Sequence, residues 1–281
     1  MTHVVFFSGG IASWGTAERV KESLGEADEL ILLFTDTLIE DPDLYRFLKE
    51  TAADLGGELV WLTEGRDPWQ VFFDVRLLGN TRADPCSRIL KRELSRKWVE
   101  ENCTPEDTTL YVGIDWTEMH RCEAIERNWK PYTVRFPLCD SPWLTRLDLI
   151  EVLRRRGIEP PALYAHGFPH NNCGGFCIKA GQGQFKMLLE GGPHLYAYHE
   201  AKEQEFREFI GKDVSILRDR TGGDTQPLTM KAFRERIEAG LLEQCDLLEW
   251  GGCGCFTDYE DEPPQAALAT PEPEGEDNGD G

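Results

Sequence analysis

Short apolar runs alternate with amphipathic segments through the first 130 residues of the chain. The apolar runs predict strands at residues 4–7, 30–34, 58–62 and 109–114. The amphipathic segments predict helices at residues 14–24, 42–55, 87–101 and 118–127. This alternation predicts an α/β fold with a doubly wound, mostly parallel sheet and right-handed crossovers. Ligands of such sheets bind at the carboxyl ends of the strands, so the loops at residues 8–13, 35–37 and 113–120 are expected to form a site.

The pattern changes beyond residue 145, where strands give way to helices and to glycine-flanked cysteines. Thr145 is expected to cap a helix that ends at Gly157, and helical stretches are expected at residues 183–210 and 230–242. We therefore expect an α/β nucleotide-binding domain at residues 1–165. A cysteine-rich, mainly helical extension packed on it is expected at residues 166–257, followed by an acidic tail at residues 258–281.

The charge of the chain narrows its partners. The formal net charge is −21, of which nine negative charges fall within residues 256–281, a segment without Lys or Arg, so that the rest carries −12. Such an acidic chain is not expected to bind nucleic acids in general, because that binding relies on Lys and Arg. The tail is rich in Pro, Glu, Gly and Asp, which predicts disorder. Without a membrane-spanning apolar run or a signal-peptide pattern, we expect a cytoplasmic protein with no membrane partner.

The loop that follows the first predicted strand is the most informative segment for function. It reads Ser8-Gly9-Gly10-Ile11-Ala12-Ser13 and precedes a helix. Glycines let the backbone approach an anion, and the first N–H groups of the helix point at it, so the loop is suited to phosphate. The alternative is a plain Gly-Gly turn with Ser13 as the helix N-cap.

Several segments together resemble a known family. The strand, the SGGIAS loop and the helix resemble the PP-loop superfamily of adenine-nucleotide α-hydrolases. Within it, the segments 84–92, 113–121 and 143–177 are similar to the phosphoadenosine phosphosulfate (PAPS) reductase family. The resemblance covers roughly residues 3 to 180. It implies an adenine nucleotide, either PAPS, adenosine phosphosulfate (APS) or ATP, as the ligand.

Departures from the family pattern bear on the reaction. Ala12 stands where nucleotide-splitting members carry an acid that helps hold Mg²⁺, and the reductases' Glu-Cys-Gly-(Leu/Ile)-His tail is absent. Cluster-binding APS reductases have two adjacent cysteines where this chain has Cys86, and a C-x2-C pair where it has C-x3-C. Members borne by bacteriophages often depart in this way, and the chain resembles them.

Nine positions are expected to bind the nucleotide. Asp36 would accept from adenine or ribose, and the cations would pair with a phosphosulfate or triphosphate, since Arg binds such groups in bidentate fashion. The alternatives are a cap or turn for Asp36 and a solvated helix face for Arg92. The full set is Ser8, Gly9, Gly10, Ser13, Asp36, Lys91, Arg92, Gly113 and Arg121.

The cysteines predict a metal centre. Four thiolates suit a [4Fe–4S] cluster, with zinc as the alternative, and the expected ligands are Cys86, Cys173, Cys177 and one of Cys253 and Cys255, with Cys253 preferred. His166 and His170 are alternative ligands, and separately buried cysteines are the other interpretation. The remaining thiol of the Cys253 and Cys255 pair would be the catalytic nucleophile, because a neighbouring cluster or cation lowers a thiol pKa.

Three functions follow from these features. The first is a PAPS/APS reductase-like oxidoreductase of sulfur metabolism that acts at the phosphosulfate through a cysteine thiol. Its partners would be a thioredoxin-like reductant and a second copy of the chain. The second is ATP-dependent adenylylation with sulfur transfer, as in thiolation or DNA phosphorothioation proteins. The third is a nucleotide-binding protein without catalysis.

Overall fold

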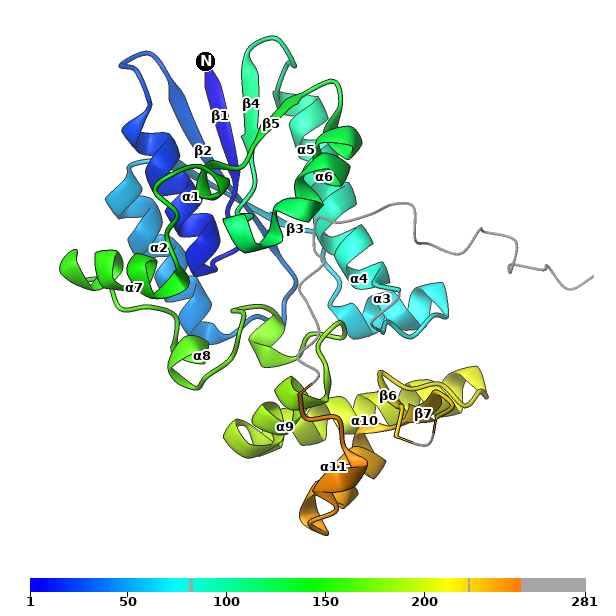
Figure 1. Ribbon diagram of the computed structural model, residues 1–281. Helices are drawn as coiled ribbons and strands as arrows, with labels where there is room; N and C mark the ends of the chain where they lie inside the picture. The colour runs from blue at the N-terminus through cyan, green and yellow to red at the C-terminus, as the bar shows by residue number, and fades with distance from the viewer. Residues whose placement is uncertain (81–82, 222, 249–281) are drawn as a thin grey trace, which may run out of the picture.

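A parallel sheet forms the centre of the molecule. In the computed structural model, which describes residues 1–80, 83–221 and 223–248, five strands lie in the order β3-β2-β1-β4-β5 and every neighbouring pair is parallel (Figure 1). The strands are β1 (Thr2–Phe6), β2 (Glu29–Asp36), β3 (Glu58–Thr63), β4 (Thr108–Tyr111) and β5 (Thr133–Arg135). The predicted α/β class and parallel sheet are confirmed, while the three-residue β5 was missed because it is too short to show a period.

Helices cover both faces of this sheet. The side chains of β1 alternate, so that Val5 packs with α1 (Ile11–Glu22), α2 (Pro42–Leu55) and α7 (Arg146–Arg155), whereas Val4 packs on the opposite face. That opposite face is covered by α5 (Leu94–Asn102) and α6 (Cys122–Trp129) (Figure 1). Because β1 is buried on both faces, its sequence is a continuous apolar run.

Local signals set the starts of α2 and α7, whereas α1 starts without a side-chain cap. Asp41 caps α2 ahead of Pro42, and Thr145 and Asp148 form a capping box on α7. The N-cap of α1 is Gly10, so the expectation that Ser13 could cap this helix is wrong. Ser13 lies in the first turn, and its hydroxyl donates to the Gly10 carbonyl at 2.8 Å.

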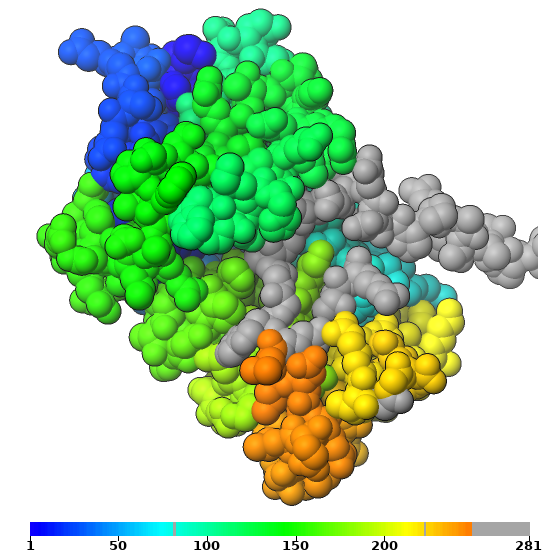
Figure 2. Space-filling view, viewed as in Figure 1, coloured from blue at the N-terminus to red at the C-terminus, as the bar shows by residue number. Residues whose placement is uncertain are grey.

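The chain beyond residue 160 packs below the carboxyl ends of the strands. It forms α8 (Ala162–Ala165), α9 (Gln182–Gly191), α10 (Pro193–Ile210), the hairpin β6 (Leu217–Asp219) with β7 (Gln226–Leu228), and α11 (Met230–Glu238) (Figures 1 and 2). The stretch expected at residues 183–210 is broken between α9 and α10, because Pro193 begins the second helix.

A separate core stabilises this C-terminal part. It takes in Trp69 and Phe72 of α3 (Pro68–Val75), a helix that the sequence analysis missed, together with side chains of α9, α10 and α11. Trp69 and Phe72 are almost fully buried in this core. Helix α3 lies before residue 165, where the domain boundary was expected. The core of the C-terminal part therefore contains side chains from both sides of that boundary.

The segment with Cys86 is one bent helical stretch. It runs from α4 (Pro85–Ser87) through a π-helical turn at Arg88–Glu93 into α5. π-Turns within helices occur frequently at functional sites, and this one carries Lys91 and Arg92. Among the described residues, no helix combines the length and the apolar character that crossing a membrane requires.

Candidate nucleotide and thiol sites

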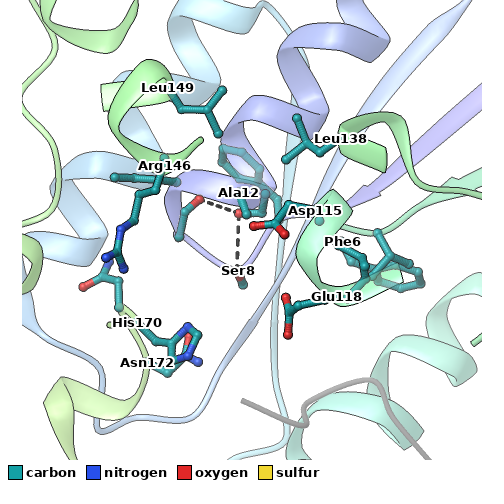
Figure 3. A pocket seen from close by; sticks show the side chains of 18 of the residues that line it. Phe6, Ser8, Ala12, Asp115, Glu118, Leu138, Arg146, Leu149, His170 and Asn172 are labelled. Atoms are coloured by element: carbon teal, nitrogen blue, oxygen red, sulfur yellow. Dashed lines mark hydrogen bonds between the residues drawn. The ribbon is translucent and has the colours of Figure 1, made fainter. Parts of the chain in front are cut away.

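A cavity of about 310 Å³ lies at the carboxyl ends of β1, β2 and β4. Side chains from several loops surround it, among them Ser8, Asp115, Glu118, Arg146 and His170 (Figure 3). Since β1 sits between β2 and β4, whose connections leave in opposite directions, the cavity lies at the topological switch point of the sheet. All three loops that the sequence analysis selected supply lining residues.

The loop after β1 has the geometry of an anion site. Gly9 has a φ of +77°, and a Cβ placed there would lie 2.8 Å from Leu44 Cγ, so glycine is required. Its carbonyl accepts a hydrogen bond from Asn171 Nδ2 at 2.9 Å, and the Ile11 N–H donates to the Tyr164 hydroxyl at 3.3 Å. The loop leads directly into α1, whose N-terminus carries the positive end of the helix dipole.

Gly113, just after β4, lets two segments meet closely. A Cβ at this position would lie 2.9 Å from the backbone nitrogen of Ser13 and 3.0 Å from its Cα. Neither backbone segment can move without shifting β4 or α1. Gly113 therefore sets the width of the cavity between the first turn of α1 and the end of β4.

Three cations line the cavity, and each is held by neighbours. Lys91 is 7% exposed, and its Nζ lies 3.7 Å from Glu40 Oε1. Arg121 pairs with Glu118, while Arg146 donates to the Pro169 carbonyl at 2.7 Å and stacks over Tyr164. Their positive charges favour an anionic ligand in the cavity.

The structure brings together most of the expected nucleotide residues. Ser8, Gly10, Ser13, Lys91, Gly113 and Arg121 line the cavity. Gly9, Asp36 and Arg92 are not among the lining residues. Asp36 accepts from Leu38 N, the Tyr45 hydroxyl and Trp61 Nε1, and Arg92 forms a buried pair with Asp84. These contacts give Asp36 and Arg92 a role in holding the loops, and ligand contact by either one stays a prediction.

A second, small cavity of about 30 Å³ holds the thiols. Cys86, Cys173 and Cys177 all line it, although they lie up to 91 positions apart in the sequence. Lys91 and Asn172 line both cavities, so the thiol pocket adjoins the nucleotide pocket. The three cysteines therefore share one pocket, and whether they act as ligands or as separately buried residues stays open.

Cys173 sits in a strained turn between the two cavities. Its φ is +50°, and its backbone N–H donates to Glu40, which also accepts from the Thr37 hydroxyl. Burial raises the pKa of the Cys173 thiol well above its usual value, and the nearby Glu40 carboxylate adds to this, whereas Lys91 opposes it. The thiol is therefore protonated at neutral pH until a metal ion or a stronger cation displaces the proton.

The donor chemistry of this pocket suits a soft metal group. Cysteine thiolates are the usual ligands of an iron–sulfur cluster or of structural zinc. The pocket offers three of the four thiolates that such a site needs. Cys253 and Cys255 lie outside the described residues. Within residues 1–80, 83–221 and 223–248, no three His, Cys, Asp or Glu side chains are placed so that they could hold one ion together. Neither His166 nor His170 lines the thiol pocket, and His170 lines the nucleotide cavity instead.

Two of the remaining cysteines lie side by side, which their sequence positions did not predict. Cys122 Sγ and Cys139 Sγ are 3.9 Å apart, and the Cys139 thiol donates to the Ile114 carbonyl. Burial, followed by the neighbouring Cys122, raises the pKa of Cys139 to about 12. Both thiols pack into the core behind the cavity wall rather than into the cavity.

Some cavity residues were missed by the sequence analysis. Tyr164, Arg146 and Asn171 come from the segment 143–177, which was selected for its resemblance without any of these three residues being singled out. The Asn171-Asn172 pair precedes the Cys173 turn, and this polar pair next to a glycine-rich turn was the available signal. Asp115 and Glu118 lay within a selected loop but were not singled out.

Comparisons with known proteins give similarities to solved structures alone. No family model and no curated protein matches the chain. The PAPS reductase from Candida auris, solved as a phosphate complex, has a TM-score of 0.42 and 14% identity over 59% of this chain and 78% of its own. The U34-tRNA thiolase NcsA from Methanococcus maripaludis, with its [4Fe-4S] cluster, has a TM-score of 0.38 and 19% identity over 55% of this chain and 57% of its own.

A third similar structure is a predicted tRNA methyltransferase subunit from Methanocaldococcus jannaschii. Its TM-score is 0.35 at 17% identity, over 57% of this chain and 90% of its own. Likenesses of this size do not identify the ligand, the reaction or the family of this chain. The likeness to phage-borne members also stays a prediction.

Proposed function

We propose that the chain is a PAPS/APS reductase-like enzyme that binds an adenine nucleotide in the large cavity. The observation that carries the proposal is the adjacency of two pockets, one built on a phosphate-type loop and the other lined by three thiols, with Lys91 between them. A phosphosulfate bound at the loop would extend its negative charge towards Lys91. The reacting sulfur would then lie near the thiol side of the site.

The reaction needs two thiols. One thiolate attacks the sulfonate sulfur, an S–S bond forms, and the S–O bond to the nucleotide breaks as the nucleotide leaves with the electron pair. A thiol of a thioredoxin-like protein then attacks the enzyme sulfur, releases sulfite and leaves a disulfide. Cys255 or Cys253 is proposed as the first thiol.

A metal group on Cys86, Cys173, Cys177 and Cys253 stays a prediction, because no three metal-binding side chains of the described residues are placed to hold one ion together. Bound there, an iron–sulfur cluster or zinc would keep the ligating cysteines in their thiolate form. The chain's own contribution is to keep Lys91 and the Cys173 turn in place through Glu40.

The experiment measures sulfite release from PAPS and from APS with a thioredoxin system, under anaerobic conditions, together with iron and sulfide content. Sulfite should form with the wild type and should be lost in Cys253→Ser or Cys255→Ser. Cys103→Ser, whose thiol lines neither pocket, serves as the matched control. Absence of sulfite from both sulfonucleotides in metal-loaded protein would refute the proposal.

Adenylylation with sulfur transfer is the second candidate. It is favoured by the carboxylates of Asp115 and Glu118, which line the cavity and could help hold a cation in place of the acid missing at Ala12. Pyrophosphate release from ATP and Mg²⁺ without sulfite would support it, and silence in both assays would support a nucleotide-binding protein without catalysis.

A further inference from the structure

One of the two polar atoms in the Asn171 side chain has a hydrogen-bond partner, and the other has none among the described residues. It is 2% exposed, its Nδ2 donates to the Gly9 carbonyl at 2.9 Å, and its Oδ1 has no hydrogen-bond partner among the described residues. Because the Gly9 carbonyl oxygen can only accept a hydrogen bond, the amide nitrogen of Asn171 must be the end that faces it. The atom without a partner is therefore the amide oxygen, which is a hydrogen-bond acceptor.

The surroundings of Asn171 indicate where its missing partner comes from. Buried polar atoms in native proteins nearly always have a partner, and an orphaned one calls for an explanation. Asn171 lines the 310 Å³ cavity beside Ser8 and Gly10 of the phosphate loop. A group bound in this cavity can supply the missing donor if the wall around Oδ1, which is closed in this structure, opens when the ligand binds.

We propose that Asn171 serves the nucleotide site with both ends of its amide, in that Nδ2 fixes the phosphate loop and Oδ1 accepts a hydrogen bond from the bound ligand. This inference rests on the proposed nucleotide binding. In a trans peptide the C=O and N–H point in opposite directions, so holding the Gly9 carbonyl towards Asn171 turns the Gly10 N–H the other way. Asn171 thus sets the orientation of a loop N–H that an anion would use.

The group that meets Oδ1 must be a hydrogen-bond donor, and beside the phosphate loop an O–H donor is expected, because the adenine amino group lies at the other end of a nucleotide. Phosphate and sulfate oxygens are acceptors at neutral pH, so they cannot satisfy an amide oxygen. A ribose hydroxyl can, and so can a water molecule held by Mg²⁺ on the nucleotide's phosphates, because Mg²⁺ keeps several of its waters when bound. Both sources present the same chemistry to Asn171, and the experiment separates them.

The test is calorimetric titration of the full chain with AMP and ATP, in EDTA and with Mg²⁺, and with their 2′-deoxy and 3′-deoxy forms. Asn171→Ala should weaken binding roughly tenfold, the cost of losing hydrogen bonds at the site. Asn102→Ala is the matched control, since Asn102 lies at the end of α5 and lines neither cavity. Asn171→Asp keeps an acceptor but cannot donate to Gly9, so it should bind more weakly while keeping the dependence on the ligand's donor.

The donor itself is identified by the ligand series. Removing the correct hydroxyl, or removing Mg²⁺, should lower the wild-type affinity towards that of Asn171→Ala, which also lacks the contact to Gly9, and should leave the affinity of that variant unchanged. If the wild-type affinity falls when Mg²⁺ is removed, the donor is a metal-bound water. If it falls with one of the deoxy ligands, the donor is that ribose hydroxyl.

Each other result overturns a stated part. Equal binding by Asn171→Ala and the wild type refutes the whole inference and leaves nucleotide binding intact. A loss of the same size for every ligand and condition refutes the role of Oδ1. A wild type that is indifferent to Mg²⁺ and to both hydroxyls refutes that role even if the variants do not fold. A wild type that binds no adenine nucleotide refutes the proposed function, and the inference with it.

Discussion

The two glycines of the phosphate loop should respond to alanine in opposite ways. A Cβ on Gly9 would lie 2.8 Å from Leu44 Cγ, and the residue has a φ of +77°. A Cβ on Gly10 would have its nearest atoms, the Tyr164 hydroxyl and Ser8 Oγ, at 3.4 and 3.5 Å, without positive φ. Gly9 is therefore required by the fold, whereas Gly10 keeps space free beside the cavity.

The magnitudes follow from these contacts. In Gly9→Ala the left-handed backbone costs about 1–2 kcal/mol and the overpacking against Leu44 about 1–3 kcal/mol. The sum of about 2–5 kcal/mol should lower the melting temperature by roughly 5–15 °C in a chain of this size. Gly10→Ala should change the melting temperature little but reduce nucleotide affinity at least about tenfold, because its methyl group occupies space where a phosphate would approach the backbone.

Thermal unfolding and calorimetric titration of AMP and ATP measure the two effects. Gly56→Ala is the matched control, since Gly56 has a φ of +72° at the end of α2 but no atom within 4 Å of its Cβ position. It should show the backbone cost without the clash. The reasoning is refuted if Gly10→Ala melts as low as Gly9→Ala, if it binds as the wild type does, or if Gly56→Ala and Gly9→Ala are equally destabilised.

Three further predictions concern other parts of the chain. Gly174→Ala places a Cβ 2.9 Å from the Ile39 carbonyl and should weaken nucleotide binding and alter thiol accessibility to a maleimide probe, whereas Gly211→Ala, with a similar φ and nothing within 4 Å, should do neither. Burial raises the pKa of Glu203 from 4.5 to about 7, so its contribution to stability is complete below pH 4.5 and is lost as the pH rises through 7. The difference in unfolding free energy between the wild type and Glu203→Gln should therefore fall by on the order of 3 kcal/mol across that range in chemical denaturation, and an equal pH dependence of the two would contradict this. Truncation after residue 258 should leave the melting temperature nearly unchanged, and a large drop would show that the acidic tail docks.

The sheet was predictable from the sequence because strands buried on both faces appear as unbroken apolar runs. The position of the larger cavity followed from the rule that ligands bind at the carboxyl ends of the strands, combined with the loop at Ser8. The start of α1 was misjudged because Ser13 has the side chain of an N-cap, whereas the turn needs Gly9 and Gly10 at its start. Helix α3 was missed although its start carries the usual signals, a capping box between Asp67 and Gln70 and Pro68 at the first helical position.

The partners of charged and thiol side chains lay beyond the reach of the sequence. Arg92 was expected at the ligand, yet Asp84, eight positions earlier, pairs with it in the core. The neighbours of Cys86 come from a segment nearly 90 positions away, and only packing of that segment beneath the sheet makes one pocket of them. A pattern along the chain records periodicity and spacing, but it does not record which distant side chains come to face each other.

The segment from Asn171 to Cys177 explains why the two pockets belong together. Asn171 holds the Gly9 carbonyl of the phosphate loop, and two positions later the Cys173 N–H donates to Glu40, the acid that faces Lys91. One short stretch therefore fixes the anion loop at one end and the thiol pocket at the other. A displacement of either end is transmitted to the other through a few bonds, because the turn between them is buried and strained at Cys173. The two pockets are thus linked through this stretch and through their shared lining residues, and under the proposed function changes at the thiols should be judged by nucleotide affinity as well as by metal content.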